Sequence, residues 1–339
     1  MNNSLFDKIY GCLVGGLIGD AMGAPSEGMH YRQIAEKFGE IRDFQGEGTD
    51  DSAIKMILCK AILENGGEVT ADEFAESFLR GKQYERLFYH PVHNMLNKVR
   101  AGLTLPVYAG LGNMQSSSSA MAISPMGIIN ALDPRQAALE TYDVAGLIHA
   151  GDTTFCRDAA CAMAAAVAEA LKPEATVEGV LAASVQYLHK ISSAVMREAI
   201  ARTLEAARQT GKYETFREAF YGRFLQEVTC DSRETVPCAL SLFWLAKGDP
   251  NIAIPAAANF GRDADTIGTM VGALCGALKG ASAIKAEWVE KADKSFAKDG
   301  EASAQTTLAW DLIAVVAKRN ERRAAALATW DRMSQKERA

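Results

Sequence analysis

The chain has 339 residues, 48% of them hydrophobic, and is therefore long enough to bury a large core. A formal net charge of −6 without a basic run argues against nucleic acid as the main ligand. Seven cysteines without a CxxC pair predict reduced thiols in a cytoplasmic protein. The first residues resemble no secretion signal and no apolar run has the length of a membrane span, so we expect no membrane contact.

Glycine recurs at every fourth residue of the first apolar stretch, from Gly11 to Gly23. Each helical glycine costs about 1 kcal/mol relative to alanine, so this spacing predicts a helix whose backbone packs closely against another element. Asp20 interrupts the stretch and argues against a pair of membrane-spanning helices. Glu27 follows the stretch, either as a solvent-facing turn residue or as part of a site.

An acidic loop at residues 46–52 leads into the next helical pattern. Its glycines loosen the backbone, so that the adjacent Asp50 and Asp51 can turn inward together. Thr49 precedes the two carboxylates, and apolar residues at helical spacing follow them. The sequence therefore predicts a group of oxygen atoms at the entry to a helix.

Two surface helices are predicted for residues 70–80 and 84–100. The segment 84–93 contains tyrosine, phenylalanine and histidine side chains, which could stack on a base or a ribose. An aromatic helix end that packs on the core is the commoner arrangement, and we expect it here.

A flexible loop is predicted at residues 110–119, because glycine and serine are dense there. His149 precedes an alanine-rich run at residues 156–171, which predicts a buried central helix. A lone histidine at such a position is more often a core residue than a catalyst, and Asp152 serves either a helix cap or a site. The aromatic residues farther on have the spacing of a core stripe without a ligand: Tyr213, Phe216, Phe220 and Phe224.

A second acidic loop, at residues 259–266, precedes another glycine-rich helical pattern. Asp263 and Asp265 are two residues apart, so they cannot share one face of a regular helix, but they can converge from a loop. We expect Thr266 at or near the N-cap of the following helix. In that helix glycine again recurs at every fourth residue, from Gly268 to Gly280.

The two acidic loops are more than 200 residues apart in the sequence, yet each places two aspartates and a threonine at the start of a predicted helix. Four aspartates in one core would repel each other strongly unless cations were bound between them. Carboxylate and hydroxyl oxygens suit hard cations such as Mg²⁺, Mn²⁺ or Ca²⁺, and not zinc or copper. The sequence therefore predicts one shared site for one or two divalent ions.

These motifs resemble those of the ADP-ribosylglycohydrolase family in their letters, order and spacing. The resemblance covers residues 5–285 and includes the opening at residues 11–23, Glu27, the segment 148–152 and both acidic loops. It implies two divalent cations, Mg²⁺ in the first place and Mn²⁺ as the alternative. The metal residues that it implies are Thr49, Asp50, Asp51, Asp263, Asp265 and Thr266.

The resemblance also implies candidates for catalysis and for substrate binding. The general base would be one of three carboxylates, namely those of Glu27, Asp51 and Asp263. The substrate-binding residues would be Ser117, Ser118, Ser119, Met121 and His149.

The predicted fold is all-α, with a single domain over residues 1–339 in which residues 286–339 form peripheral helices. We expect the site at helix N-termini near the middle of the molecule.

The segment 117–122 departs from the family pattern. Ser117 and Ser118 stand where the family has Asn-Gly, and Ala122 stands where it has arginine. Loss of an arginine removes a bidentate contact to a diphosphate. We therefore expect diphosphate recognition to be weakened or supplied by Arg86, Arg100 or the serine backbone amides.

Three hypotheses for the function follow. The first is a hydrolase that cleaves the anomeric bond of an ADP-ribosyl group on a small molecule or on an ADP-ribosylated protein. The second is the same metal chemistry on a smaller ribose-containing compound such as a nucleoside, which the altered segment favours. The third is a catalytically silent binding or structural protein, which the complete acidic loops disfavour.

Overall fold

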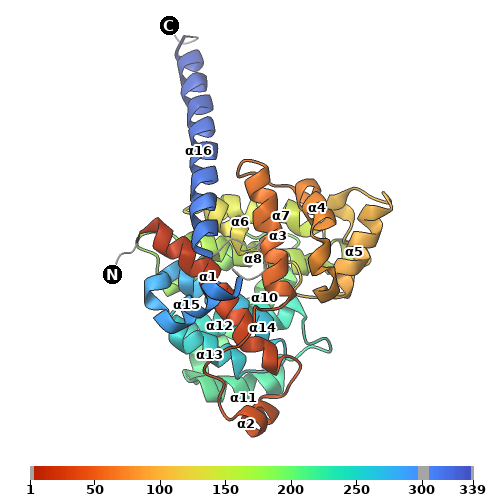
Figure 1. The fold of residues 1–339 in the computed structure, drawn as a ribbon, viewed down its shortest axis with the longest axis vertical. Helices are drawn as coiled ribbons and strands as arrows, with labels where there is room; N and C mark the ends of the chain where they lie inside the picture. Colours follow the sequence, from red (N-terminus) through yellow and green to blue (C-terminus); the bar gives the residue numbers. More distant parts are fainter. Residues whose placement is uncertain (1–3, 297–304, 337–339) are drawn as a thin grey trace.

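The computed structural model describes residues 4–296 and 305–336 (Figure 1). Within this part of the chain all regular elements are helices, apart from isolated bridges between His30 and Gly261 and between Leu111 and Ala150. The all-α prediction is confirmed. The α-helices are α1 (Leu5–Gly23), α2 (Tyr31–Phe38), α3 (Asp50–Glu64), α4 (Ala71–Arg80), α5 (His90–Arg100), α6 (Ser124–Ile129), α7 (Pro134–Gly146), α8 (Thr154–Ala170), α9 (Val177–Gln186), α10 (Ala194–Thr210), α11 (Tyr213–Arg223), α12 (Ser232–Leu245), α13 (Pro250–Ala258), α14 (Ala264–Lys279), α15 (Ala286–Phe296) and α16 (Gln305–Lys336).

Helices α1 and α14 pack against each other through their two glycine ridges, as the spacing predicts. A methyl group placed on Gly15 would lie 2.5 Å from the carbonyl oxygen of Gly272, and one on Gly19 would lie 2.0 Å from that of Gly268. Such distances are too short for any Cβ, so only glycine allows this backbone contact. Both ridges are buried, and the pair forms the centre of the molecule.

The remaining helices surround this pair. Helices α12 and α13 pack beside α14 (Figure 1). Helix α8 packs against both α7 and α9. The alanine-rich α8 is buried along nearly its whole length, as predicted. In α11, Phe216 and Phe220 are fully buried and contact Phe260, so the predicted aromatic stripe is a core element.

The sequence predicts one helix for residues 84–100, but the structure has two shorter helices there. A 3₁₀ helix spans Lys82–Leu87, and α5 begins only at His90. Pro91 explains this start, because its fixed φ and missing N–H suit the first turn of a helix and not its interior. The last residue of the 3₁₀ helix, Leu87, and the two residues between the helices, Phe88 and Tyr89, border the candidate site.

The C-terminal helices lie at the periphery. In α15, Trp288 is buried against the core, while the first turns of α16 pack on α1, where Trp310 stacks on Phe6 with ring centroids 4.2 Å apart. Beyond the buried Arg319, α16 projects away from the body (Figure 1). Within the described residues, we find no helix with the length and apolar character needed to cross a membrane.

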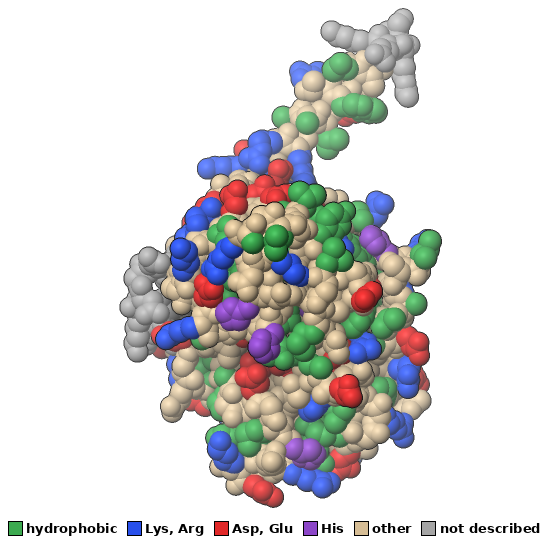
Figure 2. All heavy atoms as spheres, turned by 90° about the vertical axis from the view of Figure 1, so that its right-hand side faces the viewer, with side chains coloured by type: hydrophobic (Ala, Val, Ile, Leu, Met, Phe, Trp, Pro, Cys, Tyr) green, Lys and Arg blue, Asp and Glu red, His purple; other side chains and the backbone are tan. Residues whose placement is uncertain are grey.

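The surface carries charges of both signs. On the face drawn in Figure 2, basic and acidic side chains are interspersed, without a large patch of one sign.

The helix contact can be tested by adding one methyl group. In Gly272→Ala the new Cβ would lie 2.1 Å from the Gly15 carbonyl oxygen, so the helices must separate. We expect the free energy of unfolding, measured by urea denaturation, to fall by about 1–3 kcal/mol. Gly222→Ala in α11 is the matched control, because nothing lies within 4 Å of its Cβ and alanine favours a helix. Equal stability of Gly272→Ala and the wild type would contradict the close contact.

Candidate active site

The helix pair brings the end of α1 to the start of α14. A Cβ on Gly23 would lie 2.4 Å from both the carbonyl oxygen of Ala264 and the backbone nitrogen of Asp265. The chain then turns through a short 3₁₀ helix at Ala24–Ser26, where the buried Ser26 hydroxyl donates to the carbonyl oxygens of Gly23 and Ala258. This turn places Glu27 directly beside the second acidic loop.

Backbone hydrogen bonds fix the segment after Glu27 to this loop. The Gly28 N–H donates to the Arg262 carbonyl over 2.7 Å, and the Arg262 N–H donates to the Met29 carbonyl over 2.9 Å. Gly261 has φ of +80°, and a Cβ there would lie 2.3 Å from the Met29 oxygen, so glycine is required. Arg262 has φ of +61° and is held by an ion pair with Glu234 at 2.7 Å.

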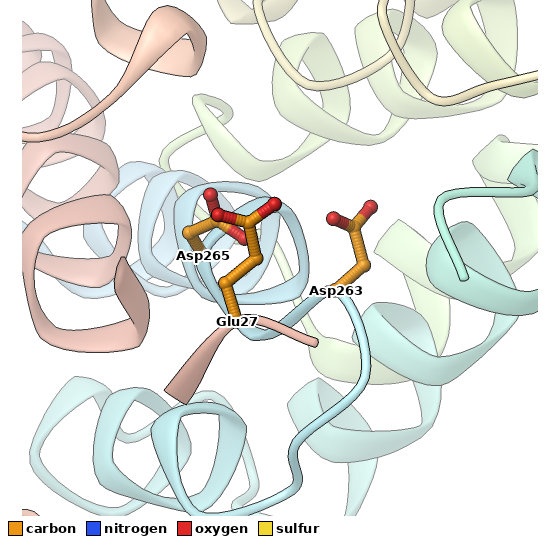
Figure 3. A group of neighbouring side chains, drawn as sticks. All are labelled: Glu27, Asp263 and Asp265. Carbon is orange, nitrogen blue, oxygen red and sulfur yellow. The ribbon is translucent and has the colours of Figure 1, made fainter. Parts of the chain in front are cut away.

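Three carboxylates converge at this point. Glu27, Asp263 and Asp265 each offer an oxygen atom, and these atoms lie within 4.8 Å of one another. Figure 3 shows that Asp263 and Asp265 extend from the start of α14, while Glu27 approaches from the segment after α1. Asp263 is the N-cap of α14 and Asp265 lies in its first turn. Thr266 is also inside this turn, three residues after the N-cap, and therefore lies near the cap as expected.

The first acidic loop is held by Asp20. Its carboxylate, fully buried in α1, accepts hydrogen bonds from the Thr49 N–H over 2.9 Å, the Ser52 N–H over 3.0 Å and the Ser52 hydroxyl over 2.5 Å. Gly48 has φ of +88°, and a Cβ there would lie 2.6 Å from an Asp20 carboxylate oxygen. Thr49 is the N-cap of α3, and its hydroxyl accepts from the Asp51 N–H.

The two acidic loops meet at Asp51. Its Oδ2 accepts from the Thr49 hydroxyl over 3.2 Å and from the Thr266 hydroxyl over 3.4 Å. A cavity of about 360 Å³ opens over this junction. Its polar lining includes Glu27, Thr49, Asp50, Asp51, Asp263, Asp265, Thr266, Ser117, Ser118 and Thr229. Its other side chains are Leu87, Phe88, Tyr89, Met121 and Cys230.

Burial and mutual repulsion perturb the carboxyl groups strongly. Burial, with the charges of Glu27 and Asp50, raises the pKa of Asp263 to about 8. Burial, with the charges of Asp20 and Glu27, raises the pKa of Asp50 to about 7. The pKa values of Asp51 and Asp265 are raised well above the ordinary range, first by burial and then by neighbouring aspartates.

Three of these oxygens lack a hydrogen-bond donor in the described part of the chain: Asp51 Oδ1, Asp263 Oδ2 and Asp265 Oδ1. A buried carboxylate oxygen without a donor is unfavourable, and it becomes favourable when a cation binds. The converging carboxylates and the hydroxyls of Thr49 and Thr266 form a donor set of oxygen atoms. It therefore fits hard divalent cations such as Mg²⁺ or Mn²⁺.

The serine loop contributes to the cavity only in part. Ser117, Ser118 and Met121 line it, whereas Ser119 and His149 lie behind the wall. The His149 ring is fully buried, with Nδ1 2.6 Å from the Ser119 hydroxyl and Nε2 3.0 Å from that of Ser116. Burial lowers the pKa of His149 to about 3, so the imidazole is neutral and holds the loop in place.

None of the arginine positions considered in the sequence reaches the cavity. Ala122 is buried outside the lining, so an arginine there would face the core. Arg86 and Arg100 do not line the cavity either, and Arg100 forms a bidentate ion pair with Glu85 at 2.6 and 2.7 Å. The described residues that line the cavity include no lysine or arginine.

Comparison with known proteins identifies the family. A sequence model described as ADP-ribosylglycohydrolase matches residues 1–324. The chain belongs to the ADP-ribosylglycohydrolase family. Members of this family generally depend on divalent metal ions. The chain is a hydrolase that acts on glycosidic bonds.

Two relatives and one solved structure give the range of similarity. The chain is 31% identical to the uncharacterized protein YegU of Escherichia coli (strain K12), over 82% of this chain and 89% of YegU. It is 25% identical to an uncharacterized protein of Archaeoglobus fulgidus, over 84% and 91% of the two chains. A structure titled "ADP-ribosylglycohydrolase-related protein complex" shares the fold, with a TM-score of 0.66, 22% identity and coverage of 92% of this chain and 99% of that one.

The sequence alone gave no role to several residues at this family site. Asp20 is the one charged residue in the apolar, glycine-rich stretch 11–23, and this pattern indicates a buried polar contact. Thr229 and Cys230 line the cavity from the segment before α12, where no motif marks them. Tyr89 belongs to the aromatic segment that we expected to pack on the core, but it is 40% exposed and borders the cavity.

The raised pKa values predict a specific pH dependence in the metal-free protein. Between about pH 4 and about pH 8 the native state binds more protons than the unfolded state, so these groups reduce stability as pH rises. We expect Asp263→Asn, compared with the wild type in a chelator, to gain melting temperature progressively from about pH 5.5 to about pH 8.5. Asp152→Asn is the control, because Asp152 is exposed and outside the cavity. A difference that does not change with pH would contradict the crowded carboxylates.

Proposed function

We propose that the chain is a metal-dependent hydrolase that cleaves the anomeric bond of a ribosyl substrate in this cavity. The observation that carries the proposal is the convergence of Glu27, Asp263 and Asp265, whose oxygens lie within 4.8 Å of one another. Beside them, buried oxygens of Asp51, Asp263 and Asp265 have no donor in the described part of the chain. Two divalent cations, Mg²⁺ or Mn²⁺, would be held by Thr49, Asp50, Asp51, Asp263, Asp265 and Thr266. The silent-protein hypothesis is disfavoured, because all of these residues line one cavity.

The bound cations would supply Lewis acidity toward the ribose hydroxyls and water. The chain's own residues would orient the sugar. The Ser117 hydroxyl donates to the Cys230 carbonyl over 2.7 Å and lies 2.5 Å from the Thr235 hydroxyl, so the serine loop is fixed at the cavity wall. A fixed wall reduces the entropy lost when the substrate is positioned.

Among the three candidate carboxylates, we assign the general base to Glu27. The residue is the exposed member of the acidic cluster, whereas Asp51 and Asp263 are buried. Its carboxyl group is nevertheless partly buried at the cavity, and this burial, with the Asp20 charge, raises the pKa of Glu27 toward the value that a base needs at neutral pH. Glu27 would take a proton from a water molecule while the oxygen of this water attacks the anomeric carbon. The reaction would pass through an oxocarbenium-like transition state.

The test is a set of loop variants assayed with Mg²⁺ on ADP-ribosyl-arginine, ADP-ribosyl-serine, ADP-ribose 1″-phosphate and a nucleoside panel. We expect Asp50→Ala and Asp265→Ala each to lower turnover by at least about 100-fold, because both remove charge that organises the transition state. Both variants should also lose most of the Mg²⁺-dependent rise in melting temperature.

Asp152→Ala should keep both turnover and the response to Mg²⁺, since Asp152 is exposed and distant from the lining. The proposed function falls if the wild type hydrolyses no ribosyl bond in this panel. The shared metal site falls if calorimetry finds unchanged Mg²⁺ affinity in both loop variants.

A further inference from the structure

The charges that line the cavity have one sign. Its carboxylates belong to Glu27, Asp50, Asp51, Asp263 and Asp265, and no lysine or arginine of the described chain lines it. Two divalent cations would be surrounded by these carboxyl groups, and no described side chain of the lining is a lysine or an arginine. A diphosphate in this cavity would therefore meet no cationic hydrogen-bond donor from the described lining.

Two of the arginines that lie close in sequence to lining residues are already paired, while Arg86, which precedes Leu87, is exposed and outside the lining. Arg262 donates to both carboxylate oxygens of the buried Glu234, over 2.7 and 2.9 Å. Arg233 pairs with the buried Asp231, with its Nη2 2.5 Å from a carboxylate oxygen. Turning either arginine toward a ligand would leave a buried carboxylate without its partner, which is strongly unfavourable.

The uncharged part of the lining includes Tyr89. This residue lines the cavity together with Asp50 of the first acidic loop and Cys230 of the segment before α12. Tyr89 is 40% exposed and lies beside Leu87 and Phe88 in the lining, so an aromatic ring is available to a ligand there.

We propose that the substrate is a compact, uncharged riboside, with its ribose at the carboxylates and its flat aglycone stacked on Tyr89. This inference rests on the proposed function and names its substrate class. A cavity of about 360 Å³ is at the small end of ligand sites and suits one sugar with one ring system. Hydrolysis adds water across the bond from the anomeric carbon to the aglycone, giving free ribose and the aglycone carrying the proton.

Binding can be measured without turnover by using a C-nucleoside such as formycin B, whose carbon–carbon glycosidic bond resists hydrolysis. Titration calorimetry on the Mg²⁺-loaded protein would compare formycin B, its 5′-monophosphate and ADP-ribose. We expect the neutral nucleoside to bind at least about tenfold more tightly than either charged ligand. Equal or tighter binding of a charged ligand, or no binding of formycin B, would overturn the inference.

The failure of this inference is distinguishable from that of the proposed function. If ADP-ribosyl bonds are hydrolysed and charged ligands bind best, the proposed hydrolase function is supported and the inference of an uncharged substrate is wrong. If no ribosyl bond is hydrolysed, the proposed function falls whatever the order of affinities.

Two pairs of variants test which residues set the preference for an uncharged ligand. Thr229→Arg adds a cation to the lining and should reduce the preference for formycin B over its monophosphate by about tenfold, whereas Thr229→Gln should not. Tyr89→Leu should weaken formycin B by about tenfold or more, whereas Tyr89→Phe keeps the ring and should bind like the wild type. An unchanged preference in Thr229→Arg, or wild-type affinity in Tyr89→Leu, would contradict the proposal.

Discussion

The close backbone contact between α1 and α14 is the constraint on which the site depends. Glycine from each helix faces the partner's carbonyl oxygens at distances that exclude any side chain. The contact continues to Gly23 and Ala264, where α1 ends and α14 begins. Because the helices cannot slide apart at this end, Glu27 and Asp265 are held at one point although 238 positions separate them in the sequence.

Electrostatic repulsion is the second organising feature. The site keeps several carboxyl groups away from water, and it leaves three of their oxygens without donors. Asp20 and Lys55 lie beneath the cavity, where Asp20 is satisfied by the first acidic loop and the Lys55 ammonium donates to the Thr269 hydroxyl over 2.8 Å. The Asp20 carboxylate thus has hydrogen-bond donors, while the proposed cations would take this role for the carboxylates above it.

Sequence patterns predicted the helix contact, which is marked by a glycine repeat, and the shared site, which is marked by clustered aspartates. Glycine at every fourth position indicated the helix contact, and two acidic helix entries indicated a shared site, because neither pattern is stable without a partner. The patterns could not place Thr229, Cys230 or Tyr89, since their roles depend on tertiary contacts across the cavity. Sequence patterns also could not show that Ala122 and His149 are buried and outside the cavity lining, because burial depends on how the folded segments pack.

The most direct test of this account is an anomalous diffraction measurement on crystals soaked in Mn²⁺. The account predicts anomalous peaks within coordination distance, about 2.0–2.3 Å, of carboxylate oxygens from both loops, including Asp51, Asp263 and Asp265. Their unpaired oxygens should turn toward the peaks while the α1–α14 contact stays unchanged. Fully occupied Mn²⁺ elsewhere on the protein, with no peak between the two loops, would contradict the central claim.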